Sequence, residues 1–129
     1  QIGGGLVCLF DRAVQVRHRE GKAVTGNLGV AVGVGGGAPE TPVKVIEKFF
    51  EYNRIDCVGS VSAQGPACCF TCGYGENCKV GAIHMFFGPG TEITPEIVPD
   101  LTKQPDAIEQ ARELGRTLNN RLKQFAGGT

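Results

Sequence analysis

The chain has 129 residues, enough for one domain, and 41% of them are hydrophobic, enough for a core, which excludes a disordered protein. Thirteen basic and thirteen acidic side chains cancel, so charge gives no reason to expect nucleic acid or an anionic membrane as a partner. No apolar run approaches the roughly 20 residues that a transmembrane helix needs. We therefore expect a single domain that neither crosses a membrane nor binds nucleic acid.

Six cysteines are compatible with disulfides, a metal site or redox chemistry. Disulfide frameworks belong mainly to small secreted domains that cannot build a core. This chain is core-forming, and its N-terminus has no charged segment followed by an apolar one, the pattern of a signal peptide. The sequence therefore predicts free, metal-bound or redox-active thiols in a reducing compartment, the cytoplasm.

The first predicted element is a helix over residues 5–20, which Gly21 ends. Residues 28–34 follow as a continuous apolar run bounded by glycine, typical of a strand that is buried on both faces of a parallel sheet. After a turn, Thr41 is expected to cap a second helix, with Pro42 at its first position. The inner faces of the two helices are expected to carry Leu6, Leu9, Phe10, Ala13, Val14 and Arg17 in the first, and Val43, Ile46, Phe49 and Phe50 in the second.

Residues 55–63 are expected to form a second strand, and residues 64–103 a long stretch rich in Gly, Pro and Cys. Loops of this length in compact domains are usually functional or carry small inserted elements. Pro105 then begins a strongly periodic helix that runs to about Phe125. Its inner stripe is Ile108, Ala111, Leu114, Leu118, Leu122 and Phe125, with Glu109, Arg112, Arg116 and Arg121 outside.

This order of elements predicts an incomplete α/β sheet. A helical crossover between the two strands makes them parallel, and a parallel sheet needs further strands and cover on both faces. The chain also begins Gln-Ile-Gly without an initiator methionine. We therefore expect another chain or an upstream segment to complete the sheet, which in the first case makes the protein a homo- or hetero-oligomer.

Two segments carry a family resemblance: Leu9-Phe10-Asp11-Arg12-Ala13, and the stretch 21–30, which reads Gly-Lys-Ala-Val-Thr-Gly-Asn-Leu-Gly-Val. With the glycine turn 35–37 and the closing segment 111–116, their order resembles the flavodoxin-like NADPH-dependent FMN reductases and the related iron–sulfur flavoproteins. The resemblance covers nearly the whole chain but only the second half of the family's domain. It implies the C-terminal half of a flavodoxin-like, doubly wound parallel sheet.

The resemblance also implies that FMN lies at the carboxyl ends of the strands, where ligands bind in such folds. The turn Gly35-Gly36-Gly37-Ala38 would contact the isoalloxazine edge or another anionic group, because glycine permits close approach and the following helix start presents free N–H groups. The alternative is a tight turn that only needs positive φ. The family's phosphate-binding loop lies outside this chain, so a partner or upstream segment would supply it.

The cysteine cluster admits several interpretations. An iron–sulfur cluster would be held by Cys68 or Cys69, by Cys72 and Cys78, and by one further ligand. Zinc would be held by Cys69, Cys72, Cys78 and His84. A third interpretation is a redox pair such as Cys69 and Cys72, and a fourth is small buried hydrophobic residues. Cys8 and Cys57 are expected in the core, and Tyr74, Phe86 and Phe87 either cover a flavin face or form a local core.

The resulting functional hypothesis is an FMN-binding oxidoreductase, or an electron-transfer subunit, linked to NAD(P)H or ferredoxin, in which the cofactor carries the redox chemistry. The alternative is a non-catalytic assembly subunit with a structural metal or iron–sulfur site in the Cys-rich loop. A third is a nucleotide- or phosphate-binding module that uses the glycine turn.

Overall fold

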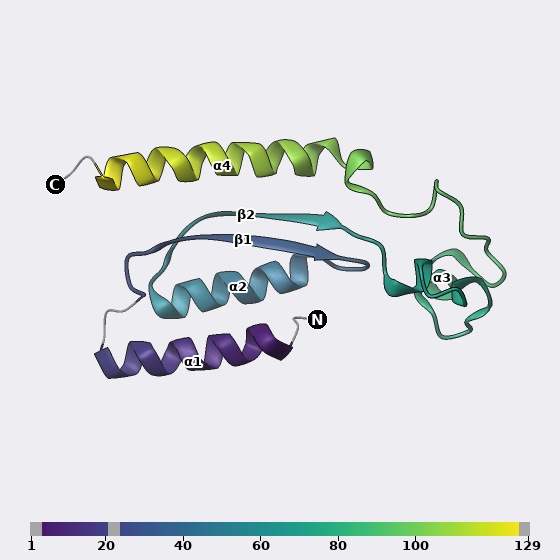
Figure 1. The fold of residues 1–129 in the computed structure, drawn as a ribbon, viewed down its shortest axis with the longest axis horizontal. Helices are drawn as coiled ribbons and strands as arrows, with labels where there is room; N and C mark the ends of the chain where they lie inside the picture. The colour runs from purple at the N-terminus through teal and green to yellow at the C-terminus, as the bar shows by residue number, and fades with distance from the viewer. Residues whose placement is uncertain (1–3, 21–23, 127–129) are drawn as a thin grey trace.

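The computed structural model describes residues 4–20 and 24–126, and shows a mixed α/β chain (Figure 1). The main elements in order are α1 (Gly4–Glu20), β1 (Leu28–Gly35), α2 (Glu40–Asn53), β2 (Asp56–Gln64), α3 (Ala82–Phe87) and α4 (Pro105–Ala126). The predicted helices and strands are confirmed within a few residues. Gly21 and the side chains of Val14 and Arg17 lie outside the described residues.

The two strands form a parallel pair, as expected from the helical crossover between them. The pairing runs from Leu28 opposite Asp56 to Gly35 opposite Gln64, with one register shift after Gly29. Both strands therefore end at the same edge of the sheet, where the residues after β2 begin (Figure 1).

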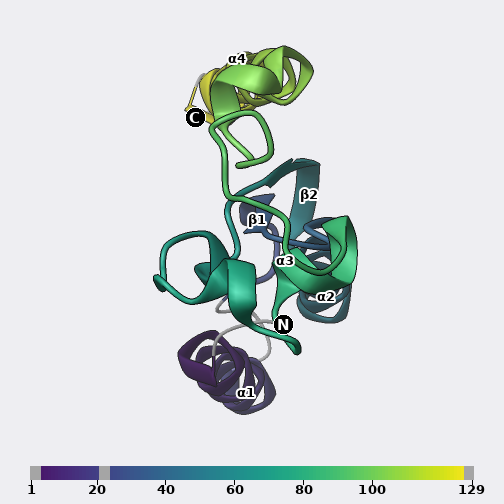
Figure 2. The same ribbon diagram turned by 90° about the vertical axis from the view of Figure 1, so that its right-hand side faces the viewer.

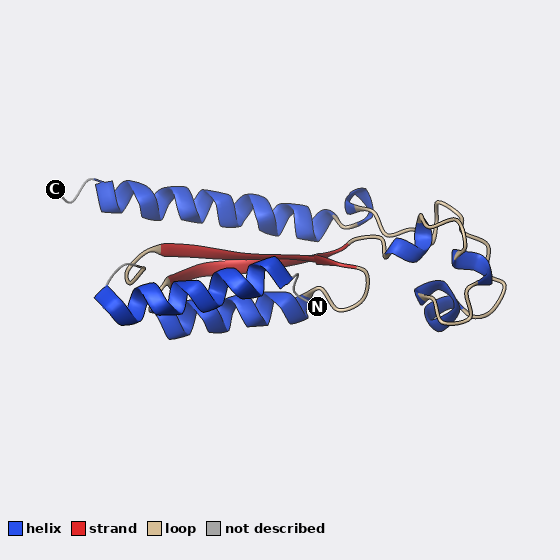
Figure 3. Cartoon of the chain, turned by 60° about the horizontal axis from the view of Figure 1, so that its bottom comes forward, coloured by secondary structure: helices blue, strands red, loops and turns tan. Residues whose placement is uncertain are grey.

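The helices lie in two layers on opposite faces of the sheet. Helices α1 and α2 lie on one side and α4 on the other (Figures 1 and 2). Helix α2 packs on both strands, whereas α4 packs on β2 (Figure 3). One face of the sheet is thus covered more fully than the other.

Close packing of α2 on β1 depends on two glycines. A Cβ atom at Gly33 would lie 2.5 Å from the Pro39 carbonyl oxygen and 2.6 Å from Val43 Cγ2. At Gly29 it would lie 2.8 Å from the ring of Phe50. The glycines of this strand therefore set the distance between helix and sheet, and Ala31 and Val43 are buried between them.

The predicted start of α2 is wrong by two residues. The helix begins at Glu40 with Pro39 as its N-cap, so Thr41 is not the cap and Pro42 is the third helical residue. Pro39 already has the helical angles φ −65° and ψ −18°. Pro42 is tolerated because N–H groups in the first turn have no partner within the helix.

The prediction that the first strand is buried on both faces is also wrong. Ala31 and Gly33 are buried under α2, but Val32 and Val34 on the opposite face are 58% and 63% exposed. Helix α4 packs instead over β2, where Leu114 occupies the space that a Cβ atom at Gly59 would need. Val32 and Val34 line a cavity of about 240 Å³ that they share with Ala107, Ile108 and Ala111 of α4. We call the side of β1 that has no neighbouring strand in the described residues the open edge.

Among the described side chains, an aromatic pair joins helix α1 to α2. The rings of Phe10 and Phe49 stack with centroids 4.1 Å apart and planes 13° apart. Leu6 and Leu9, predicted on the inner face, are 37% and 59% exposed. Among the described residues, no helix is long and apolar enough to cross a membrane.

Candidate functional site

Residues 65–104, which we call the lobe, lie beyond the carboxyl ends of both strands (Figure 1). The predicted long loop thus contains small elements, among them α3 and short 3₁₀ turns such as Cys68–Phe70. The lobe is joined to the sheet at both of its ends. Gly65 N–H donates to the Gly35 carbonyl over 3.1 Å, and the Gln104 amide binds the backbone of Gln64.

A cavity of about 210 Å³ lies between the glycine turn and the lobe. Its walls combine backbone of the turn with aromatic side chains, and the lining residues are Gly36, Gly37, Gln64, Phe70, Phe86, Phe87 and Pro99. An apolar, partly aromatic wall with a few polar groups is typical of cofactor sites. The position matches the carboxyl ends of the strands, where parallel α/β sheets bind ligands.

The predicted glycine turn divides into two parts. Gly36 and Gly37 line the cavity, whereas Gly35 and Ala38 do not. A Cβ atom at Gly36 would lie 2.8 Å from that of Ala67, so this glycine permits close approach of the lobe. Gly37 has open space around its Cα atom and accepts a 3.5 Å hydrogen bond from Gln64 Nε2 at its carbonyl. None of the three glycines has positive φ, which removes the alternative of a turn that needs it.

The start of α2 offers few hydrogen-bond donors to an anion. Pro39 and Pro42 have no N–H group, and the N–H of Thr41 donates to the Ala38 carbonyl at 3.1 Å. Glu40 adds a negative charge in the same turn. The expected free N–H groups are therefore largely missing, and the turn is better suited to the edge of a flat ring than to a phosphate.

Aromatic residues of the lobe form much of the cavity wall. Phe70 and Phe87 meet edge to face with ring centroids 6.3 Å apart, and Phe86 is 64% exposed beside them. Tyr74 does not line the cavity and is 78% exposed. Sequence reasoning thus found Phe86 and Phe87 but missed Phe70 and Gln64. Phe70 could have been found from its position inside the cysteine cluster.

The four cysteines of the cluster carry free thiols. Cys69 Sγ accepts the Ala82 N–H at 3.2 Å, and Cys72 Sγ accepts the Tyr74 N–H at 3.4 Å. In the part of the chain that is described, no three His, Cys, Asp or Glu side chains are grouped to hold a metal ion. The side chains of Cys68, Cys69, Cys72 and Cys78 are therefore not arranged as a ligand set, and the metal site stays a prediction.

The prediction that the remaining two cysteines, Cys8 and Cys57, lie in the core is wrong. Both are exposed. Cys8 lies on the same exposed part of α1 as Val7 and Leu9, which are 45% and 59% exposed. Cys57 lies at the beginning of β2, a strand whose outer side has no neighbour in the described residues.

Hydrogen bonds within the lobe hold its long connections in place. The Glu76 carboxylate accepts the Ile93 N–H at 2.7 Å. Lys103 Nζ donates to three backbone carbonyls, those of Pro95, Glu96 and Val98. Asp100 accepts both the hydroxyl and the backbone N–H of Thr102 at 2.7 Å, and these hydrogen bonds lower the pKa of the Asp100 carboxyl.

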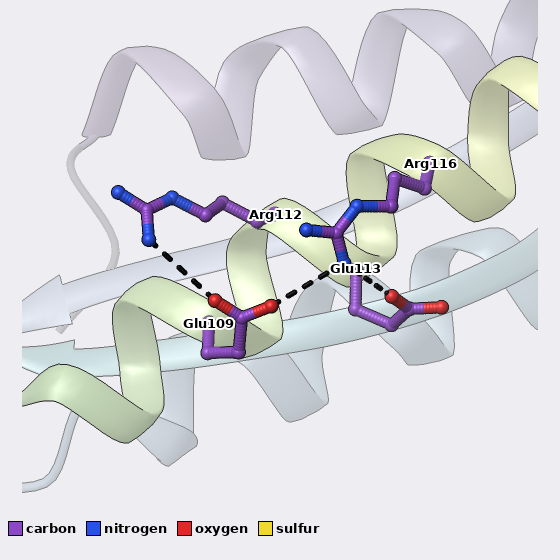
Figure 4. Close-up of polar contacts among 4 residues, drawn as sticks. All are labelled: Glu109, Arg112, Glu113 and Arg116. Atoms are coloured by element: carbon purple, nitrogen blue, oxygen red, sulfur yellow. Dashed lines mark hydrogen bonds and ion pairs between the residues drawn. The ribbon is translucent and has the colours of Figure 1, made fainter.

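The charged residues of α4 lie outside, as predicted from the sequence. Arg116 binds Glu113 at 2.7 Å and Glu109 at 3.3 Å, and Arg112 lies 3.5 Å from Glu109 (Figure 4). The Glu113 hydrogen bond, followed by that of Glu109, raises the pKa of Arg116. All four side chains are exposed, so this network contributes little to stability. Arg121 differs, because it reaches Asp56 at the start of β2 at 2.8 Å.

Comparisons of the chain with protein-family models, with curated proteins and with solved structures found no match.

Proposed function

We propose that the chain is the C-terminal half of a flavodoxin-like domain and positions FMN for electron transfer. The observation that carries the proposal is the cavity at the carboxyl ends of β1 and β2, lined by Gly37 and by the rings of Phe86 and Phe87. The two-layer arrangement, with α1 and α2 on one face and α4 on the other, is compatible with a doubly wound sheet.

In this proposal the chain binds the ring system of the flavin. Phe86 and Phe87 contact a face of the isoalloxazine, and the backbone of Gly37 meets its edge because no side chain blocks the approach. FMN, once bound, supplies the electron or hydride transfer, with NAD(P)H or ferredoxin as the donor. The protein residues orient the ring and exclude water from it.

The phosphate of FMN would be bound outside this chain. The two prolines and Glu40 at the start of α2 disfavour an anion there. We propose that a partner chain or another segment completes the sheet at the open edge and supplies the phosphate site. The support is the side of β1 that has no neighbouring strand in the part of the chain that the structure describes, since parallel sheets rarely consist of two strands.

A titration of the full chain with FMN and with riboflavin, followed by flavin fluorescence, tests this proposal. Because the ring carries the contacts, we expect the two ligands to bind with similar affinity. Phe86→Ala should weaken both about tenfold through loss of an aromatic contact. Phe125→Ala is the matched control, because this phenylalanine is 60% exposed near the C-terminal end of α4, away from the cavity.

Lack of binding by either flavin, or equal effects of Phe86→Ala and Phe125→Ala, would overturn the proposed site. The open edge also favours a second function. In it, the chain is an assembly subunit without flavin, and its cysteine loop binds zinc or an iron–sulfur cluster. Metal analysis of the purified chain separates the two, since the second requires stoichiometric zinc or iron and no flavin. In both cases we propose a reducing compartment, the cytoplasm, since disulfide frameworks belong mainly to small secreted domains that cannot build a core.

A further inference from the structure

We propose that Cys69 and Cys72 form a redox-active dithiol that accepts two electrons from the flavin of the proposed site. This inference rests on the proposed function and deepens it by naming an electron acceptor within the chain. It concerns the pair alone and not the full set of four clustered cysteines.

The backbone brings the two residues into disulfide range. Cys69 and Phe70 belong to a 3₁₀ turn, and Thr71 follows with φ −124° and ψ −4°. A chain that turns between residues i and i+3 brings their Cα atoms within about 7 Å, the range in which disulfides form. Cys72 Sγ already lies 3.6 Å from the Cys69 carbonyl oxygen, so its side chain is folded back over the turn.

Both sulfur atoms are held by backbone hydrogen bonds. The Ala82 N–H donates to Cys69 Sγ and the Tyr74 N–H to Cys72 Sγ. Gly75 fixes the turn from the other side, because a Cβ atom there would lie only 2.0 Å from the Cys69 carbonyl oxygen. Half-buried Cys69 and exposed Cys72 combine a fixed position with access for a reaction partner.

The pair lies beside the proposed flavin cavity. Phe70, between the two cysteines in the sequence, lines that cavity together with Gly36 and Gly37. The turn that positions the sulfur atoms thus also positions a wall of the flavin site. A ring bound against Phe70 would therefore lie beside the turn that carries the two cysteines.

The electron transfer balances without any further reactant. Fully reduced FMN gives two electrons and two protons, the sulfur–sulfur bond of the Cys69–Cys72 disulfide breaks, and two thiols and oxidised FMN result. A low-molecular-weight disulfide, such as glutathione disulfide, reoxidises the pair by thiol–disulfide exchange and leaves as two thiols.

The first experiment treats the full chain with glutathione disulfide and measures its intact mass. We expect the loss of two hydrogen atoms, with no glutathione attached at residues 69 and 72. Chymotryptic cleavage after Phe70 separates these residues, so the disulfide should hold the two fragments together until a reductant is added. Cys69→Ser and Cys72→Ser should each abolish the linkage, while Cys68→Ser, at the exposed neighbour, should keep it.

The second experiment mixes the oxidised chain with reduced FMN without oxygen. We expect the yellow absorbance of oxidised FMN to return while two thiols per chain appear, and neither change in the Cys69→Ser/Cys72→Ser double variant. Circular dichroism and flavin affinity of this variant should match those of the unaltered chain.

Failure of the disulfide to form, or stoichiometric zinc or iron bound by these cysteines, overturns the inference and leaves flavin binding to be judged by its own titration. A disulfide that forms but is not reduced by bound flavin also overturns it. If flavin does not bind at all, the proposed function fails as well, and the riboflavin titration identifies that case.

Discussion

The side chain of Gln104 pairs with the backbone of Gln64 as another strand would. Its Oε1 atom accepts the Gln64 N–H at 2.8 Å, and its Nε2 atom donates to the Gln64 carbonyl at 2.8 Å. These two bonds join the end of β2 to the residue before α4, at the two ends of the lobe. The end of the sheet and the start of the last helix are thus held together, although 40 positions separate the two residues in the sequence.

Gln104→Ala should lower the free energy of unfolding by about 1–2 kcal/mol, since it removes two hydrogen bonds to Gln64 and one to the Asp100 carbonyl. Urea unfolding followed by circular dichroism measures the change. Gln110→Ala, on the exposed face of α4, should change it by less than about 0.5 kcal/mol. Equal effects of the two substitutions would show that the paired amide does not stabilise the chain.

Gly33→Ala should destabilise the chain by about 1–3 kcal/mol, because the added methyl group would overlap the Pro39 carbonyl and Val43. Gly37→Ala is the matched control, since a Cβ atom there meets nothing within 4 Å. Thermal unfolding of both variants gives the comparison. A Gly33→Ala variant as stable as the control would mean that α2 is not seated on β1 as closely as described.

Arg54→Gly should stabilise the chain by about 0.5–1 kcal/mol. Arg54 ends α2 with φ 54° and ψ 39°, a left-handed conformation that costs a residue with a Cβ atom more than it costs glycine. Arg112→Gly, inside α4, should instead destabilise by about 1 kcal/mol. Urea unfolding of both variants tests the opposite signs, and a destabilised Arg54→Gly variant would contradict the assigned conformation.

Asp100 should titrate below its ordinary pKa of 3.8, because Thr102 donates two hydrogen bonds to the charged carboxylate. Its charged form therefore stabilises the folded chain fully above pH 3.8, and this contribution is lost as the pH falls through the lower, folded-state pKa. Thr102→Val, which removes the hydroxyl bond, should raise the pKa of Asp100. Carboxyl chemical shifts in an NMR titration give both values, and an unchanged pKa in the variant would contradict this cause.

The elements of the fold could be predicted because their signals are local. The apolar run 28–34 and the periodic helix after Pro105 correspond to β1 and α4. The burial of the second face of β1 could not be predicted from the sequence. The exposure of Val32 and Val34 depends on where α4 packs across the sheet. The N-cap of α2 was predicted wrongly because Pro39 precedes the helix without any side-chain hydrogen bond. The sequence Thr41-Pro42, which is typical of a helix start, lies inside the first turn instead.

Only the part of the candidate site that a single short segment forms could be predicted from the sequence. The glycine turn could be placed beside a strand end from the sequence, and Gly36 and Gly37 do line the cavity. Phe70 and Gln64 reach the same cavity through the folding of the lobe, whose 3₁₀ turns leave no periodic signal. The cysteine spacing could not distinguish a metal site from a redox pair. Whether Cys78 lies near the other cysteines depends on the path of the chain between Cys72 and Cys78.

The open edge also bears on how the chain behaves outside an assembly. Strand β1 reads Leu-Gly-Val-Ala-Val-Gly-Val-Gly, with neither a charged residue nor a proline to prevent unwanted pairing. An edge strand without such residues can pair with a strand of another copy of the chain. The partner proposed to complete the sheet would therefore also prevent self-association through residues 28–35.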